Sequence, residues 1–190
     1  MKVLIKNVRI RFASIFEPTL QPGAKEPKFG IKAIIEPGSE NAKVLEAAMT
    51  AVAKEKWKDK APNIEASFVR TGKKPDVCFV KEPYKNKDGE AYGGFEDMFY
   101  LTASAKQHER PKVVDLNPKI ELTKSDGKPY DGCYTNLSVE IWPQDNDFGR
   151  AIRAQLKGVQ FVKHGDAFGG SPPSDGSEFE TLESVDEDFV

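Results

Sequence analysis

Apolar and polar side chains alternate along several stretches of the chain, which predicts a protein built mainly from β-strands. The clearest stretch is Cys133–Trp142, where Leu137, Val139 and Ile141 alternate with polar residues. A period of two is typical of a strand with one buried face. Lys28–Glu36 and Met98–Ser104 show the same alternation. Further strands are expected at Lys2–Phe12, Ser67–Thr71, Val77–Val80, Val113–Leu116, Ile120–Leu122 and Ile152–Lys163, the last bulged at Gly158.

The first strand is irregular. Strict alternation places Leu4, Val8, Ile10 and Phe12 on one face, whereas Val3 and Ile5 fall on the other face. This break predicts a β-bulge or a buried beginning of the strand. Four phenylalanines are assigned to the core: Phe12, Phe29, Phe99 and Phe161.

Residues Ser39–Lys60 follow helical spacing. Ser39 is a suitable N-cap, and Glu40 suits the positive end of a helix dipole. Four lysines lie near the C-terminal end, where a solvated face that complements the dipole is the preferred interpretation and an anion-binding rim is the alternative. Ala61-Pro62 is expected to end the helix.

One helix among about eight short strands does not fit alternating βαβ units. It fits a mainly β protein, a small barrel with one helix inserted between strands. Lys81–Phe95 is rich in glycine and aromatic residues and is expected to form a long hairpin tip. Residues 1–168 are predicted to form one domain, followed by a flexible linker and tail at 169–190.

The charge is unevenly distributed. The chain has 30 acidic and 28 basic residues. Residues 171–190 contain seven of the acidic residues and no Lys or Arg, which leaves residues 1–170 with a net charge of +5. Because the apolar residues of this tail are sparse, we expect it to be disordered.

Composition also disfavours several classes of protein. No stretch approaches the roughly 20 apolar residues of a membrane span, and the start lacks a signal-peptide pattern. We therefore expect no membrane association and a location in the cytoplasm of whatever cell makes the protein. Cys78, Cys133, His108 and His164 lack the close pairing of zinc ligands, so neither a metal nor a cofactor is expected.

Motifs for catalysis are scarce. There is no phosphate-binding loop and no nucleophile elbow, and Gly93-Gly94 lacks a strand-to-helix setting. We therefore predict that the protein is not an enzyme. The acidic residues Glu96, Asp97, Asp145 and Asp147 keep a magnesium-dependent nuclease open as an alternative.

Basic and aromatic side chains share the predicted strand faces and the hairpin. Cations that follow phosphates and rings that stack on bases are the combination needed to bind single-stranded nucleic acid. Tyr134 and Trp142 fall opposite the apolar face of their strand. The predicted DNA-binding residues are Arg9, Arg11, Lys28, Lys32, Tyr84, Tyr92, Tyr100, Tyr134, Trp142, Arg150, Arg153 and Lys157.

Several of these stretches resemble a family of bacteriophage single-stranded-DNA-binding proteins. The resemblance is strongest over 153–163 and the Gly-Asp-Ala-Phe-Gly-Gly run at 165–170, and looser over 8–13, 28–35 and 134–142. It implies an OB-fold-like Greek-key barrel that binds single-stranded DNA without catalysis in phage replication or recombination. Its relatives include replication proteins of T7-like phages, which implies a possible homodimer.

Those relatives also carry acidic tails that end in an aromatic residue. This tail ends in Asp186, Glu187, Asp188 and Phe189, with Val190 after the aromatic residue. We expect the tail to compete with DNA for the basic groove and to recruit replication or recombination proteins. Besides the nuclease, a phage assembly protein with a basic protein-binding surface remains an alternative.

Overall fold

The structure is a computed structural model that describes residues 1–21, 23–72 and 74–168. The predicted linker and acidic tail, 169–190, lie outside the described residues. The elements are β1 (Lys2–Thr19), β2 (Lys28–Ile35), α1 (Glu40–Trp57), η1 (Lys58–Lys60), α2 (Ala61–Ala66), β3 (Phe79–Val80), β4 (Phe99–Lys106), β5 (Lys112–Val114), η2 (Lys124–Asp126), β6 (Tyr134–Asn146) and β7 (Gly149–Lys163).

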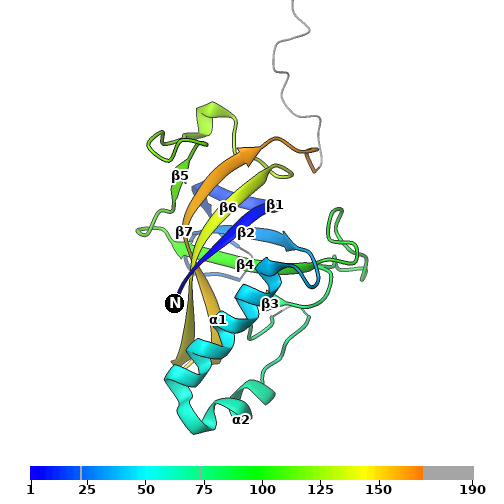
Figure 1. Cartoon of the computed structure of the whole chain (residues 1–190), viewed down its shortest axis with the longest axis vertical. Helices are drawn as coiled ribbons and strands as arrows, with labels where there is room; N and C mark the ends of the chain where they lie inside the picture. Colours follow the sequence, from blue (N-terminus) through cyan, green and yellow to red (C-terminus); the bar gives the residue numbers. More distant parts are fainter. Residues whose placement is uncertain (22, 73, 169–190) are drawn as a thin grey trace, which may run out of the picture.

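Five strands close into a barrel (Figure 1). β1 pairs antiparallel with both β2 and β6, β2 pairs with β4, and β6 pairs with β7. A parallel contact between Ser104 of β4 and Gln155 of β7 completes the circle. The short strands β3 and β5 extend the sheet beyond β4 and β7. The predicted small barrel with one long inserted helix is therefore confirmed.

Two irregularities bend β1 around the barrel. Asn7 and Phe12 both have positive φ angles, and the pairing register shifts next to each of them. The predicted bulge near the start is therefore present, and it turns Val3 and Ile5 inward together with Val8 and Ile10. The prediction that Leu4 and Phe12 share the buried face is wrong, because these side chains are 52% and 40% exposed.

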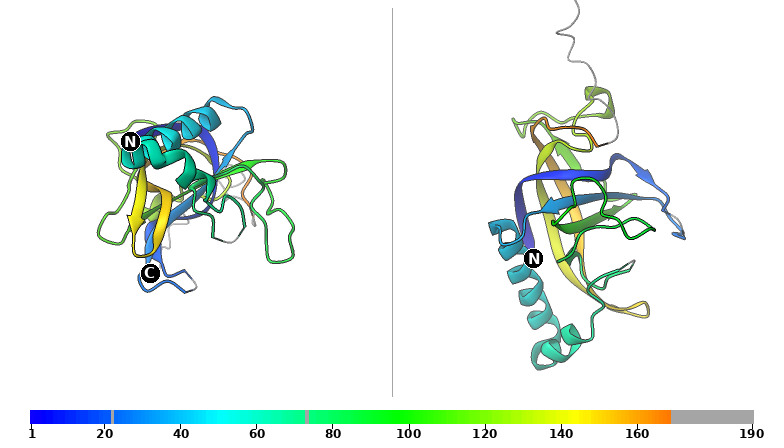
Figure 2. Two further views of the ribbon diagram at one scale, coloured as in Figure 1. Left: turned by 90° about the horizontal axis from the view of Figure 1, so that it is seen from below. Right: turned by 90° about the vertical axis from the view of Figure 1, so that its right-hand side faces the viewer.

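The predicted helix is present as α1, which packs along β1 and β6 (Figure 2). Ser39 is its N-cap and its Oγ accepts a hydrogen bond from the amide of Ala42 at 3.3 Å. The expectation that Ala61-Pro62 ends helical structure is only partly correct, because after the 3-10 turn η1 these residues begin α2. Proline is compatible with the first turn of a helix, where its missing N–H would have no helical partner.

The other predicted segments have mixed outcomes. The strand expected at Ser67–Thr71 is not formed, because α2 runs directly into an irregular segment. Val77–Val80 contains β3, and Val113–Leu116 overlaps β5 only at Val113 and Val114. The Ile120–Leu122 segment adds only an isolated bridge from Glu121. The hairpin tip within Lys81–Phe95 is present and is joined by a bridge between Lys85 and Ala91.

β6 and β7 are paired with each other over a longer stretch than any other two strands of the barrel. β6 buries Leu137, Val139 and Ile141, as its alternation predicts. The pairing register slips by one residue at Gly158, which confirms the predicted bulge. The two strands continue past the predicted boundaries to Asn146 and Gly149, where a tight turn joins them.

After β7, residues 164–168 fold back as a strap over the end of the barrel. The amide of Phe168 donates a hydrogen bond to the carbonyl of Asp131 at 3.1 Å, and the Tyr130 hydroxyl donates one to the carbonyl of Gly165 at 3.0 Å. Gly132 lies so close beneath the strap that a Cβ atom there would come within 2.2 Å of the Asp166 carbonyl oxygen. The strap therefore requires glycine at position 132.

In the described part of the chain, no helix is long and apolar enough to cross a membrane.

This packing predicts unequal costs for two glycine-to-alanine substitutions. Gly132→Ala combines a positive φ of +112° with the clash against the strap, and we expect it to lower the free energy of unfolding by about 3 kcal/mol or more. Gly89→Ala has a similar positive φ, +86°, but open space around the added methyl group, and should cost about 1–2 kcal/mol. Urea unfolding of both variants checks this. Equal losses would show that the strap does not press on Gly132.

Candidate nucleic-acid interface

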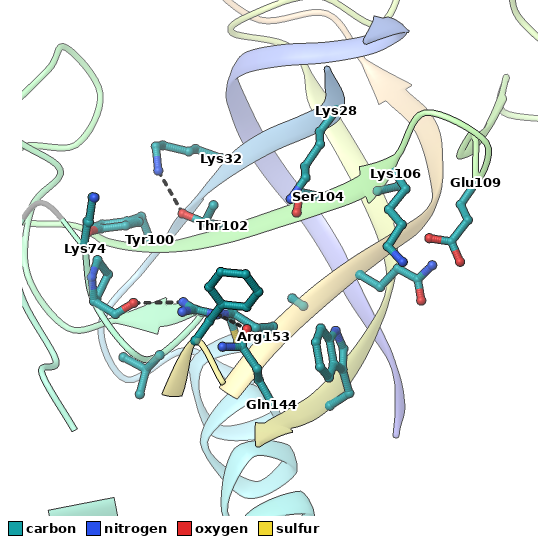
Figure 3. Close-up of a pocket in the computed structure, with 18 of the residues that line it drawn as sticks. Lys28, Lys32, Lys74, Tyr100, Thr102, Ser104, Lys106, Glu109, Gln144 and Arg153 are labelled. Carbon is teal, nitrogen blue, oxygen red and sulfur yellow. Dashed lines mark hydrogen bonds between the residues drawn. The ribbon is translucent and has the colours of Figure 1, made fainter. Parts of the chain in front are cut away.

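A groove of about 950 Å³ crosses the outer face of the barrel (Figure 3). Its floor is formed by β2, β4, β7 and β6, and the segment before β3 forms one wall. The lining residues are Lys28, Lys32, Gly72, Lys74, Pro75, Val77, Cys78, Tyr84, Tyr100, Thr102, Ser104, Ala105, Lys106, Glu109, Trp142, Gln144, Asn146, Phe148, Arg153, Ala154 and Gln155.

The floor of the groove follows from strand alternation. In β2 and β4 the apolar side chains point into the barrel, so the polar ones point outward. Antiparallel pairing places Lys28 beside Lys106 and Lys32 beside Thr102. The closure between β4 and β7 then adds the polar face of β7 to the same surface. The barrel therefore presents one continuous polar face.

Lys32 lies among aromatic rings on this floor. Its Nζ atom is 4.1 Å from the centroid of the Tyr84 ring and 5.0 Å from that of the Tyr100 ring, and it donates a hydrogen bond to Thr102 Oγ1 at 2.8 Å. Burial lowers the pKa of Lys32 to about 8. The pKa of Tyr100 is raised to about 12, mainly by burial, so its hydroxyl stays neutral. An anion that reaches this ammonium group would supply the charge partner that the rings do not.

The opposite side of the groove carries an arginine beside a tryptophan. Trp142 of β6 pairs across the strands with Arg153 of β7, so both side chains are on one face. Arg153 donates hydrogen bonds to the carbonyl of Pro75 at 2.9 Å and to Gln144 Oε1 at 3.4 Å. These contacts hold the guanidinium in place, while the Trp142 ring remains 40% exposed.

Positive charge prevails in the groove. Five of the lining residues are cationic and one, Glu109, is a carboxylate. The cations are Lys28, Lys32, Lys74, Lys106 and Arg153. A long polar channel with cations and exposed rings suits an extended polyanion that carries flat apolar groups, a description that fits single-stranded nucleic acid.

Comparison with known proteins agrees with this geometry. A family model described as the single-stranded-DNA-binding protein of Enterobacter phage Enc34 matches residues 1–190. The chain belongs to the Enc34 single-stranded-DNA-binding protein family. Putative protein p50 of Acyrthosiphon pisum secondary endosymbiont phage 1 is 35% identical over 192 residues, which cover 99% of this chain and 97% of the relative.

Solved structures show the same fold. The single-stranded DNA-binding protein of bacteriophage Enc34, in complex with single-stranded DNA, matches with a TM-score of 0.68 and 21% identity over 88% of this chain and 89% of that chain. The single-stranded DNA-binding protein gp2.5 of bacteriophage T7 matches with a TM-score of 0.54 and 16% identity over 97% and 99% of the two chains. At these identities the likeness concerns the fold, and it confirms the predicted OB-fold-like barrel.

Membership of the Enc34 family confirms the resemblance found in the sequence. It also confirms the prediction of a non-catalytic protein, because the family and the structural neighbours are described as single-stranded-DNA-binding proteins. No group of three or more His, Cys, Asp or Glu side chains in the described ranges is arranged to share a metal ion. Asp145, one of the residues behind the nuclease alternative, accepts hydrogen bonds from Trp57 and Arg150 instead.

Half of the DNA-binding residues predicted from the sequence line the groove of this Enc34-family protein, and half lie elsewhere. The first group consists of Lys28, Lys32, Tyr84, Tyr100, Trp142 and Arg153. The second group consists of Arg9, Arg11, Tyr92, Tyr134, Arg150 and Lys157.

Arg9 and Arg11 make contacts within the barrel end. Arg9 donates hydrogen bonds to the carbonyls of Gly132 and Asp166 at 3.0 and 2.7 Å, and Arg11 donates one to the carbonyl of Gly93. Their guanidinium carbons lie 4.2 and 4.8 Å from the centroid of the Phe168 ring. Both arginines thus anchor the strap.

Four more predicted residues are also engaged away from the groove. The Tyr134 ring lies beneath the Lys163 ammonium at 4.5 Å. Tyr92 stacks on Tyr84 with ring centroids 5.3 Å apart, which places it behind a lining residue. Arg150 and Lys157 form ion pairs with Asp145 and Glu140, respectively, at 3.2 Å each.

The sequence did not predict Lys106, Lys74 or Phe148 as lining residues. Lys106 continues the outward parity of β4, and a strand extended by two residues would have found it. Lys74 and Phe148 lie in a loop and in a turn, where no periodicity indicates their direction. Phe148 is 93% exposed at the turn between β6 and β7.

The desolvation of Lys32 predicts a specific dependence of stability on pH. Its pKa is about 8 in the folded protein against an ordinary value of 10.5, so the folded state carries the full cost of the buried charge below pH 8 and loses this cost as the pH rises towards 10.5. Lys32→Met should therefore raise the free energy of unfolding by about 1–3 kcal/mol at pH 7, with the gain shrinking between pH 8 and 10.5.

Denaturant unfolding at pH 7 and pH 10 measures this difference. Lys28→Met, at an exposed position on the same strand, is the control and should show no comparable gain at pH 7. A gain for Lys32→Met that is the same at both pH values would contradict the desolvation of Lys32.

Proposed function

We propose that the groove binds single-stranded DNA with little sequence preference and that the protein coats such DNA during phage replication or recombination, in the cytoplasm of the host cell. The observation that carries the proposal is the groove itself, which combines five cations, one carboxylate and an exposed tryptophan. Membership of the Enc34 family supports it, because the Enc34 protein is described in complex with single-stranded DNA.

The cations would contact phosphates. Lys28 and Lys106 are cross-strand neighbours at one part of the floor, and Arg153 is held in place by Pro75 and Gln144. Each neutralised phosphate releases counterions, so affinity should fall steeply as salt rises. An arginine fixed before binding loses little conformational entropy when the phosphate arrives.

The rings would contact bases. Trp142 offers an exposed face, and stacking of one base on an aromatic ring contributes about 1–3 kcal/mol. Every base has such a face, so stacking confers affinity without reading sequence. Tyr84 and Tyr100 are engaged with Lys32, and they would act mainly by keeping that ammonium poorly hydrated.

The direct test is a fluorescence titration with an oligo-dT strand and with a duplex of equal length at several salt concentrations. We expect tight binding to oligo-dT at low salt, weaker binding to duplex, and a linear fall of log affinity with log salt. The double variant Lys28→Ala/Lys106→Ala should reduce this slope by about 1.4, since each phosphate contact on a single strand contributes about 0.7.

A matched control for that variant is Lys2→Ala/Lys119→Ala, which removes two exposed lysines outside the groove and should leave the slope nearly unchanged. Absence of oligo-dT binding at low salt would refute the proposed function. Equal effects of the two double variants would show that the positively charged residues 1–170 bind DNA without using the groove.

We also propose that the acidic C-terminal residues compete with DNA for the groove. Seven acidic side chains within 171–190 match the positive charge of the groove, and a tethered competitor acts at high effective concentration. Displacement by DNA would free Asp186, Glu187, Asp188 and Phe189 to recruit replication or recombination proteins. The homodimer implied by the resemblance stays a prediction, which light scattering of the free protein would check.

Deletion of residues 171–190 should therefore tighten oligo-dT binding at low salt, and the gain should shrink as salt screens the competing charges. A titration of full-length and shortened protein at 20 and 300 mM salt measures both effects. A chain in which the seven acidic residues are replaced by Asn and Gln is the control for length, and it should behave like the deletion. Unchanged affinity would leave recruitment as the role of these residues.

A further inference from the structure

Phe148 is the most exposed large apolar side chain in the described residues, at 93%. It stands in the two-residue turn that joins β6 to β7, where the strands extend beyond the rest of the barrel (Figure 2). A ring so exposed contributes almost nothing to the burial of apolar surface on folding. Its position at a strand-to-strand turn requires no aromatic residue, so folding does not explain it.

The backbone of this turn is fixed. The amide of Phe148 donates a hydrogen bond to Asn146 Oδ1 at 3.0 Å, and Gln144 Nε2 donates one to the carbonyl of Gly149 at 3.3 Å. Gly149 has a φ of +101°, which glycine tolerates and other residues rarely adopt. The ring is therefore carried by a defined turn.

The ends of β6 and β7 that carry the turn are held against the rest of the protein by hydrogen bonds. Asp145 of β6 accepts hydrogen bonds from Trp57 Nε1 at 2.8 Å and from Arg150 Nε at 3.2 Å. Trp57 is buried at the end of α1, with 7% exposure. The donor from Trp57 is the main reason why the pKa of Asp145 lies below its usual value. The ends of β6 and β7 cannot carry the Phe148 ring towards the barrel unless these contacts break.

The ring also lies in line with the groove. Phe148 and Asn146 line it at the turn, and Trp142 lines it further along the same strand. Four residues of strand separate Trp142 from Asn146, a distance of about 13 Å. A single strand that stacks on Trp142 and follows the groove along β6 would therefore run towards the turn that carries Phe148.

We propose that Phe148 is a wedge for the junction between single- and double-stranded DNA: its ring inserts at the first base pair beyond the strand held in the groove and separates the two bases by stacking on one of them. The proposal rests on the proposed function, because the single strand must occupy the groove to bring a duplex end to the turn. Apolar side chains that insert between bases unstack them in other DNA-binding proteins, and a ring on a fixed backbone loses less conformational freedom on insertion than one on a mobile loop.

The test uses a duplex with a single-stranded oligo-dT extension and 2-aminopurine at the first paired position, whose fluorescence rises when that base unstacks. At saturating wild-type protein we expect the fluorescence to rise towards the value of the single strand. Phe148→Ala at its own saturating concentration should lower this rise at least fivefold. Phe148→Trp should retain it, because a larger ring supplies the same stacking.

The matched control is Leu116→Ala, which removes an exposed apolar side chain, 63% exposed, outside the groove, and should open the junction like the wild type. The wedge is refuted if saturating wild type leaves the first pair stacked, or if Phe148→Ala opens it as fully as wild type. It is also refuted if Phe148→Ala lowers the signal equally when 2-aminopurine is within the single strand. Failure of the wild type to bind oligo-dT would refute the proposed function itself.

Discussion

The parallel contact between Ser104 of β4 and Gln155 of β7 is the contact that makes the candidate interface possible. Without it the sheet would be an open ribbon that runs from β3 and β4 through β2, β1 and β6 to β7 and β5, with β4 and β7 near its opposite edges. Closure brings the outward faces of these two edges together. Lysines of β2 and β4 then share a surface with the arginine and tryptophan of β7 and β6, although the two groups are far apart in the sequence.

Which cations remain available depends on neighbours rather than on strand parity. Arg9 and Arg11 donate to backbone carbonyls and lie on the Phe168 ring, so they stabilise the strap. Arg150 and Lys157 have carboxylate partners. Lys32 and Arg153 also have neutral partners, rings and a carbonyl, but unlike Arg9 and Arg11 they line the groove, where no carboxylate of the described residues is paired with them. The groove is positive because its internal partners are neutral groups.

The sequence predicted those features of the fold and the groove that follow from strand alternation or from helical spacing. Alternation in β2, β4 and β6 indicated both the strands and the outward direction of Lys28, Lys32 and Trp142, and caps and spacing indicated α1. Parity failed in β1, because bulges at Asn7 and Phe12 reverse the faces on either side of them. Which group a cation pairs with depends on how other segments pack beside it. The alternation within its own strand carries no information about that packing. Lys74 and Phe148 lie where the chain has no period at all.

The insertion of α1 and its following segment between β2 and β4 has a consequence for how this barrel can diverge. One wall of the groove is formed by Gly72, Lys74, Pro75, Val77 and Cys78, which belong to the insertion rather than to any of the five barrel strands. Changes in the length of this segment would reshape the depth and charge of the groove without altering strand register. The floor and the buried residues Val77 and Cys78 of the wall are constrained by the packing of the core, whereas the exposed residues Gly72 and Lys74 are not. Binding properties can therefore be adjusted on one side of the site while the fold stays constant.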